Sequence, residues 1–260
     1  MKKFAYSAVA TAILAVGSTG GVVFTSSAAA EFSANISIVS DYELRGFSET
    51  DGGAAIQGGF DWEHASGFYM GTWASNVDFG SAYDDDERVT VTDDTTYELD
   101  LYLGFADSFD NGFGYDVGYV YYAYPDASVT TVDEDDGTSS SSSVSYDFGE
   151  LVGSVSYDMD MIGFYGGVQW VVTDSASESL LESDDVYFYG GLDVPFAEVY
   201  SAGFMVGRQT FDDSDADDYT HYSASLARDA GEFGEFSLNL AYADVDDEDM
   251  RAWVGWSKSF

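Results

Sequence analysis

The sequence predicts an all-β protein, an antiparallel transmembrane β-barrel of about 12 strands in up-and-down order. Apolar and polar residues alternate along many segments, and short connections alternate with longer acidic ones. Only two prolines interrupt the 260 residues, which suits long uninterrupted strands. Because side chains of a strand point to opposite faces in turn, the alternation gives each segment one apolar and one polar face.

Residues 1–30 are interpreted as a cleaved secretory signal peptide. Lys2 and Lys3 form a positive start, residues 4–24 are apolar and small, and three alanines precede Glu31, the pattern of a cleavage site. A single transmembrane anchor is the alternative, and Gly17, Gly20 and the alanine-rich exit oppose it. We expect residues 31–260 to form one barrel domain.

Twelve segments have the alternation of a strand. In the clearest, Leu99, Leu101 and Leu103 share one face, whereas Glu98 and Asp100 share the other. A tilted strand crosses a bilayer in about 9–11 residues, and ten or fourteen strands remain alternatives because boundaries shift by a few residues. The segments are 32–45, 54–63, 67–77, 97–105, 112–124, 149–157, 162–172, 185–194, 199–211, 219–228, 236–242 and 250–260.

The connections between these segments differ by parity. Those after the even segments are short (64–67, 106–111, 158–161, 195–198 and 229–235), and those after the third, fifth, seventh and ninth are acidic and tend to be longer (78–95, 125–147, 173–184 and 212–218). Outer-membrane barrels have short periplasmic turns and longer outer loops. The alternation of polar and apolar residues also fits a soluble sandwich with one wet face, but a sandwich has no reason to sort its loops by parity.

Three outer segments have further features. The outer connections 48–53 and 244–249 are short and are exceptions to the parity rule. The polyserine run, residues 139–143, is of low complexity, and we expect a flexible loop there.

A family resemblance supports the barrel. The stretch SDYELRGFSETDGGAAIQGGFDWEHASGFYMGTWASNVDFG, residues 40–80, resembles the N-terminal signature of the TorF-type porins, a proteobacterial outer-membrane group, and the ending SKSF agrees with it. The resemblance implies an outer-membrane β-barrel and a channel, without a substrate. The terminal Phe260, with apolar residues at alternate preceding positions, resembles the strand that the outer-membrane assembly machinery recognises.

The charge of the chain excludes several classes of function. The formal net charge is −40, and it becomes −42 once Lys2 and Lys3 leave with the signal peptide. Nucleic-acid binding is opposed because phosphate contacts need Lys and Arg. The chain has no cysteine, so neither a disulfide framework nor a thiolate zinc site is expected.

The polar faces of the segments would line the barrel lumen. Carboxylates outnumber the cations in this set, and acidic rings favour cation passage. Alternatively, the lumen is plugged and Arg45 and Arg251 pair with acids. The predicted lumen residues are Asp41, Glu43, Arg45, Gln57, Asp61, Glu63, Glu98, Asp100, Asp116, Gln169, Asp193, His221 and Arg251.

A calcium site in the loops is a further hypothesis. Asp213, Asp215 and Asp217 place acids at alternate positions, and Ca²⁺ takes oxygen ligands. The run lacks the loop glycine and the distal glutamate of a helix–loop–helix calcium site. A solvated acidic exterior is the alternative, suited to saline water or to lipopolysaccharide bridged by divalent ions.

The sequence therefore predicts a porin-like channel for small hydrophilic solutes, leaning toward cations, with no cofactor and no catalytic step. Its expected surroundings are outer-membrane lipid and lipopolysaccharide of a Gram-negative bacterium, with a monomer as the default. A closed barrel that interacts through acidic outer loops is the alternative. A hydrolase built on His221 is a third candidate, although no G-x-S-x-G elbow occurs.

Overall fold

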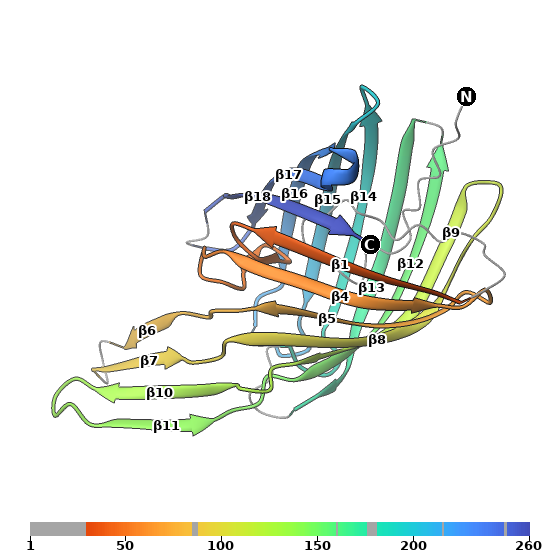
Figure 1. The fold of residues 1–260 in the computed structure, drawn as a ribbon. Coiled ribbons are helices and arrows are strands. Elements are labelled where there is room, and N and C mark those ends of the chain that lie inside the picture. The colour runs from red at the N-terminus through yellow and green to blue at the C-terminus, as the bar shows by residue number, and fades with distance from the viewer. Residues whose placement is uncertain (1–29, 85–87, 160, 176–180, 215, 247–248) are drawn as a thin grey trace.

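The computed structural model describes residues 30–84, 88–159, 161–175, 181–214, 216–246 and 249–260. Within these ranges, twelve antiparallel strands close into a barrel in which each strand pairs with the next barrel strand along the chain. The first strand pairs with the last to close it, from Asn35↔Ser259 to Val39↔Gly255. The predicted fold class and strand number are confirmed (Figure 1).

Most strand boundaries lie within a few residues of those predicted. The 3₁₀ turn η1 (Gly231–Phe233) precedes β17. The barrel strands are β1 (Glu31–Val39), β4 (Ala55–Glu63), β5 (Phe68–Asn76), β8 (Tyr97–Ser108), β9 (Phe113–Ala123), β12 (Phe148–Met159), β13 (Ile162–Asp174), β14 (Val186–Phe196), β15 (Tyr200–Thr210), β16 (Tyr219–Asp229), β17 (Glu235–Ala243) and β18 (Arg251–Ser259).

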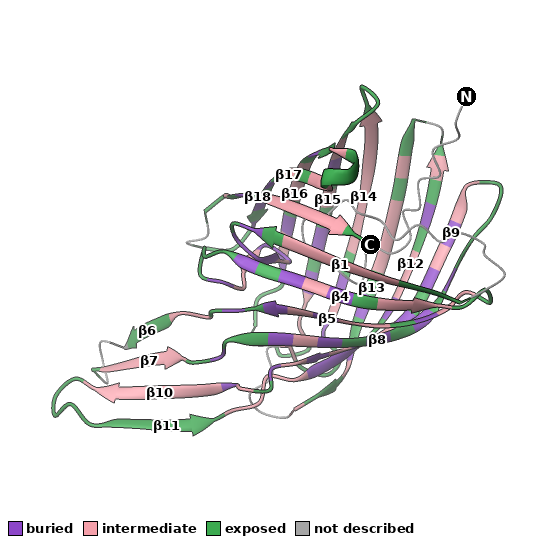
Figure 2. Ribbon diagram, in the orientation of Figure 1, coloured by how far each residue is buried: buried purple, intermediate pink, exposed green. Residues whose placement is uncertain are grey.

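The barrel exposes its apolar side chains and buries its polar ones. On β8, Leu101, Leu103 and Phe105 are 51%, 48% and 52% exposed on the outer wall, whereas Glu98 and Asp100 are buried inside. Figure 2 shows the resulting change of burial class along the barrel strands. A barrel that meets hydrocarbon outside and polar groups inside has this inverted pattern; a soluble barrel would bury its apolar face.

The loops sort by parity as predicted, with one correction at the first of them. Residues 32–45 were expected to form one strand, but β1 ends at Val39 and residues 40–54 fold into the barrel as a hairpin. This segment, the lumen hairpin, contains β2 (Glu43–Leu44) and β3 (Phe47–Ser48), which pair with each other. The first outer connection is therefore long, and 48–53 is no exception to the parity rule.

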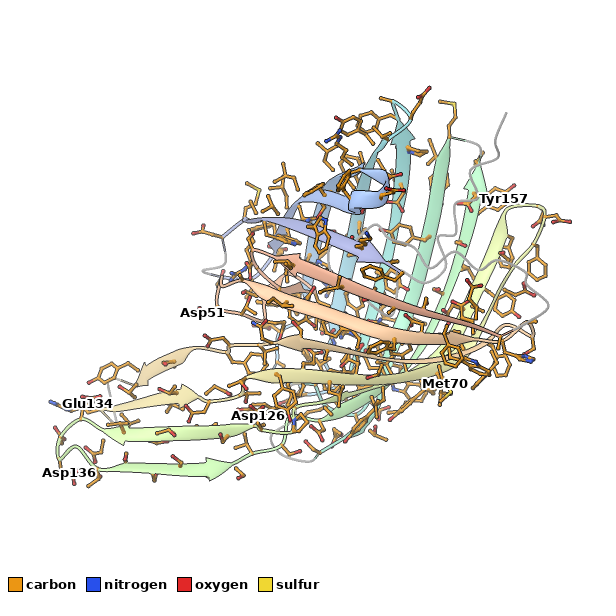
Figure 3. The ribbon with its side chains drawn as sticks, viewed as in Figure 1. Asp51, Met70, Asp126, Glu134, Asp136 and Tyr157 are labelled. Carbon is orange, nitrogen blue, oxygen red and sulfur yellow. The ribbon has the colours of Figure 1, made fainter. Side chains whose placement is uncertain are left out.

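Two outer loops form a second sheet beyond the barrel. It contains β6 (Ser81–Asp84), β7 (Val89–Asp93), β10 (Ser128–Asp133) and β11 (Ser139–Ser143) in the order β11-β10-β7-β6. Figure 1 shows it as an arm that extends from one end of the barrel. Glu134 and Asp136 lie at its tip (Figure 3).

The polyserine run is an edge strand and not the flexible loop that its composition suggested. Val132 to Ser128 of β10 pair with Ser139 to Ser143 in unbroken register, and the Thr130 and Ser141 hydroxyl oxygens lie 2.7 Å apart. Backbone pairing to a β-branched neighbour therefore decides the conformation of the run.

The buried core occupies the inside of the barrel. Residues of the lumen hairpin and of the inner wall form it together, among them Tyr42, Trp73, Tyr122, Phe148 and Trp253. Among the described residues, no helix is both long and apolar enough to cross a membrane. The barrel interior is thus a packed region at the depth of the hairpin.

The outer wall generates a first prediction. Leu103→Arg should destabilise the folded barrel by about 2–4 kcal/mol, because a cation at mid-depth on the lipid face loses its hydration. Asp107→Arg is the matched control, since Asp107 is exposed two positions beyond Phe105, near the end of the same strand. Urea unfolding in lipid vesicles measures both, and equal destabilisation would contradict the assignment of the outer wall.

Candidate functional site: the barrel lumen

The lumen hairpin turns through two residues with left-handed backbone. Glu43 pairs with Ser48 and Leu44 with Phe47, which leaves Arg45 at φ 51° and Gly46 at φ 102° in the turn. Two successive positive φ angles are the requirement of a type I′ hairpin turn. The turn places Arg45 at the innermost point of the hairpin.

The hairpin contacts opposite sides of the barrel wall. On one side, the Tyr42 hydroxyl donates to Glu98 of β8 over 2.9 Å, and the Tyr42 ring packs edge-on against Trp73 of β5. On the other side, Phe47 packs edge-on against Tyr219 of β16, with ring centroids 5.1 Å apart. The hairpin therefore crosses the lumen.

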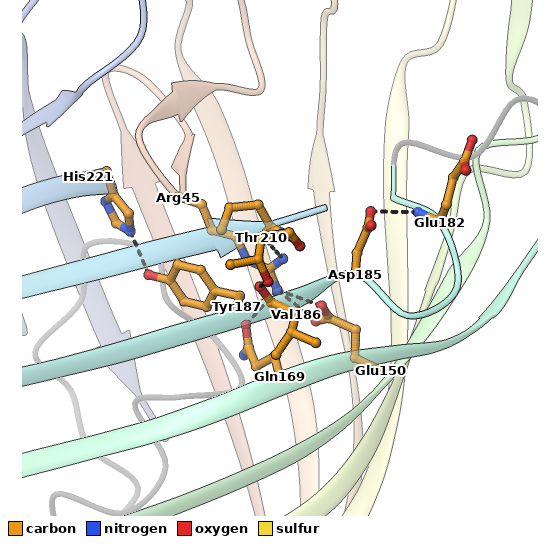
Figure 4. A network of polar contacts seen from close by, with 10 residues as sticks. Arg45, Glu150, Gln169, Glu182, Asp185, Val186, Tyr187, Thr210 and His221 are labelled. Carbon is orange, nitrogen blue, oxygen red and sulfur yellow. Dashed lines mark hydrogen bonds and ion pairs between the residues drawn. The ribbon is translucent and has the colours of Figure 1, made fainter. Parts of the chain in front are cut away.

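Arg45 contacts four consecutive strands of the inner wall (Figure 4). Its Nη2 donates to both carboxylate oxygens of Glu150 on β12, at 2.7 and 2.8 Å, and to Gln169 on β13 at 2.5 Å. Its Nη1 donates to Gln209 on β15 at 3.0 Å. The guanidinium carbon lies 4.5 Å from the ring centroid of Tyr187 on β14.

The Arg45–Glu150 ion pair is buried, with side-chain exposures of 7% and 0%. Two charges taken out of water cost free energy unless they are paired and hydrogen-bonded. Glu150 supplies the opposite charge, and the two glutamine oxygens accept further hydrogen bonds from the guanidinium. Removing one partner would leave a buried unpaired charge, so hairpin and wall depend on each other.

Tyrosine hydroxyls, rather than cations, donate to several lumen carboxylates. Tyr69 donates to Asp116 over 2.7 Å, and Tyr102 donates to Asp61 over 2.5 Å. Asp100, two residues after Glu98 on the same inner face of β8, is 2% exposed. Asp61 and Asp116 thus accept hydrogen bonds from neutral tyrosine donors and not from cations.

The other predicted lumen residues fall into three groups: residues on the hairpin, half-buried residues on the barrel strands and buried residues on the barrel strands. Asp41 and Glu43 lie on the hairpin instead of a barrel strand, where Asp41 accepts hydrogen bonds from Ser48 and Thr50 and Glu43 accepts one from the Gly46 backbone. This corrects their expected position, because β1 ends before them. The remaining members lie on the barrel strands: half-buried Asp61, Glu63, Asp193 and Arg251, and buried Glu98, Asp100, Asp116, Gln57, Gln169 and His221.

His221 is part of the wall against which the hairpin rests. Its Nε2 lies 2.5 Å from the Tyr187 hydroxyl, and its ring stacks on the Tyr187 ring with centroids 5.6 Å apart. The side chain is 1% exposed. This burial favours a packing role for His221.

Sequence reasoning missed Glu150 and Gln209, two of the residues that hold Arg45. The alternation of the segment 149–157 carried a signal for Glu150, since Leu151 and Val155 face outward and place residue 150 on the inner face. Gln209 is fully buried near the end of β15, where the exposed polar Arg208 follows the exposed apolar Phe204 and Val206 and interrupts the alternation.

The structure leaves the calcium hypothesis as a prediction. Asp213 and Asp217 are exposed in the connection between β15 and β16, and Asp215 lies outside the described residues. Among the described residues, no three His, Cys, Asp or Glu side chains are grouped so that they could hold a metal ion.

The hairpin carboxylates generate a prediction on pH. Burial raises the pKa of Glu43 to about 7; the hydrogen bond from the Gly46 backbone N–H opposes the rise, Asp41 adds to it and Arg251 opposes it. Burial and the neighbouring Glu98 and Glu43 raise the pKa of Glu49 to about 8. Because both pKa values exceed the ordinary 4.5, the docked hairpin binds more protons than a hydrated one. Docking is strongest at acid pH, weakens as the pH rises above the ordinary pKa of 4.5, and levels off once the pH passes the raised pKa values.

Hydrogen exchange of the hairpin amides, corrected for the chemical exchange rate, measures this effect. Protection of residues 41–50 should fall between about pH 5 and pH 8. The variant Glu43→Gln/Glu49→Gln is the control, and its protection should be nearly flat with pH. An unchanged pH dependence in the variant would contradict the assignment to these two carboxylates.

The barrel is similar to solved outer-membrane barrels of low sequence identity. The KdgM porin superposes with a TM-score of 0.54 at 10% identity, covering 88% of this chain and 99% of that one. KdgM in complex with disordered oligogalacturonate gives 0.51 at 9% identity, with 88% and 98% covered. The translocator domain of autotransporter NalP from Neisseria meningitidis gives 0.53 at 11% identity, with 89% and 88% covered.

At the level of sequence, no curated protein matches the chain. A family model does match, from residue 24 to residue 258, which is nearly the whole length. The chain belongs to the family described as "Bacterial protein of unknown function (Gcw_chp)".

Proposed function

We propose that the chain is a porin-like channel of the Gram-negative outer membrane, through which small hydrophilic solutes diffuse passively. The observation that carries the proposal is the inverted barrel, with large apolar side chains outside and carboxylates inside. The fold likeness to the KdgM porin supports it, as does the resemblance of residues 40–80 to the TorF-type porins. No catalytic step or cofactor is needed for passage.

The lumen charge supports a preference for cations. Asp61, Asp100 and Asp116 face the interior, and the hydrogen bonds described for Asp61 and Asp116 come from neutral groups. Rings of one sign attract the opposite ion and repel the like one. Galacturonate is a carboxylated sugar, so an acidic lumen disfavours the ligand that accompanies KdgM.

The expected setting follows from the outer wall and the chain end. The apolar band would contact outer-membrane lipid, and the acidic outer loops would face lipopolysaccharide. Phe260 would be read by the assembly machinery; in the barrel its backbone N–H donates to the Ala34 carbonyl over 2.9 Å. We propose a monomer, because one chain closes the barrel.

Neutralising the lumen carboxylates tests the cation preference. In a KCl gradient across a planar bilayer, Asp61→Asn, Asp100→Asn and Asp116→Asn should each lower the K⁺/Cl⁻ permeability ratio, by up to about fivefold for a contact of about 1 kcal/mol between hydrated charges. Asp107→Asn, on the outer wall, is the control and should leave the ratio unchanged. An anion-selective barrel would contradict the cation preference, and a folded barrel that stays silent in every variant would contradict the channel.

A second candidate is a closed barrel that acts through its outer surface. The crossing of the lumen by the hairpin favours it, and so does the outer sheet with its exposed edge strand β11. In this candidate the acidic loops, including Asp213, Asp215 and Asp217, bind a partner or Ca²⁺. Calorimetry at millimolar Ca²⁺ would show heat that a triple Asp→Asn variant lacks; absence of heat counts against the calcium site.

A further inference from the structure

The lumen hairpin is attached to the barrel without being part of its sheet. Val39 and Ala55, the residues that flank it, are directly paired partners of β1 and β4. Its own strands pair with each other, separately from the closed barrel. The barrel ladder is therefore complete without residues 40–54, and the hairpin can change position while every barrel strand stays paired.

Polar contacts hold the hairpin inside together with the ring contacts of Tyr42 and Phe47. Arg45 donates to Glu150, Gln169 and Gln209, and Tyr42 donates to Glu98. Water can replace each of these polar contacts if the hairpin moves outward, because the freed groups become hydrated rather than orphaned. The cost of undocking is therefore lower than that of exposing an apolar core of the same size.

The tip of the hairpin fits its wall closely. A Cβ at Gly46 would lie 2.9 Å from the Ala243 Cβ and 3.0 Å from the His221 Cβ. Only a residue without a side chain lets the turn rest against β16 and β17. The turn is thus closely packed against the barrel wall and does not lie in an open space.

We propose that the lumen hairpin is a reversible plug, which leaves the lumen as a unit to open the channel, and that the Arg45–Glu150 ion pair is its latch. The proposal rests on the proposed function, since a plug matters only in a barrel that conducts. The wall partners of Arg45 come from β12, β13, β14 and β15. When Arg45 leaves, Glu150 joins the carboxylates of the lumen, so that opening also adds a negative charge to the permeation path.

A reversible crosslink tests the motion. The chain has no cysteine, so Phe47→Cys/Tyr219→Cys introduces one specific pair and leaves Gly46 unchanged. The two rings that these cysteines replace pack with centroids 5.1 Å apart, and a short reducible reagent that reacts with two thiols can join the pair across the space they leave. Crosslinking, checked by mass spectrometry, should abolish single-channel openings, and a reductant should restore them. The two single-cysteine variants should not respond to either reagent.

A second variant covers the case in which the crosslink does not form. Arg45→Ala removes the latch and should raise the ratio of open to closed time by about tenfold or more, since breaking a buried pair costs more than the 1.4 kcal/mol that a tenfold ratio represents. Arg45→Lys keeps the charge but loses the planar donors, and should fall between Arg45→Ala and the wild type.

The outcomes distinguish a failure of the plug proposal from a failure of the channel proposal. Openings that are the same with and without reductant in the crosslinked barrel, or an open-time ratio unchanged in Arg45→Ala, would overturn the plug and leave the channel standing. A folded barrel that is silent in every variant, reduced or crosslinked, would overturn the proposed function itself.

Discussion

The docked position of the lumen hairpin depends on one buried ion pair, between Arg45 at the hairpin tip and Glu150 on β12. A buried carboxylate without a partner costs several kcal/mol, roughly 3–5 when a pair is broken. The hairpin brings the cation that Glu150 requires, and the wall supplies the carboxylate that Arg45 requires. The type I′ turn and the bare Gly46 then follow as geometric conditions for delivering Arg45 to this depth.

The scarcity of cations shapes the rest of the lumen. The chain has eight Lys and Arg against 48 Asp and Glu, so most lumen acids cannot form ion pairs. Tyrosine takes the place of the cation as donor at Glu98, Asp61 and Asp116. These rings also fill space over glycines of neighbouring strands; a Cβ at Gly71, for example, would lie 2.5 Å from the Tyr102 ring. A tyrosine hydroxyl supplies a carboxylate with a hydrogen bond from a neutral donor, where an ion pair would need a cation.

The strands of the barrel could be predicted from the sequence because lipid and lumen impose alternation on each of them. The same alternation is the reason that the hairpin was not predicted. Glu43 and Leu44 continue the polar–apolar pattern of β1, because β2 is itself a short strand. Gly46 was the local sign of a turn, but only the register of β1 with β4 shows that the ladder resumes at Ala55.

The core of the candidate site could not be predicted for a different reason. Glu150 and Gln209 lie 105 and 164 residues from Arg45 in the chain, and no periodicity links residues so far apart. The polyserine strand β11 likewise depends on its partner β10. The sequence pattern predicts features that depend on a single strand and its surroundings. Features that depend on which strands pack together can be seen only in the folded structure.

The most direct test removes the hairpin and keeps the barrel. Because Val39 and Ala55 are paired partners, an Asn-Gly turn can replace residues 40–54 and close β1 onto β4 as a two-residue hairpin. Single-channel recording of this variant in a KCl gradient should give long, cation-selective openings of larger conductance than the full chain. A folded variant that does not conduct, or that selects anions, would contradict the account of an acidic channel closed by its own first loop.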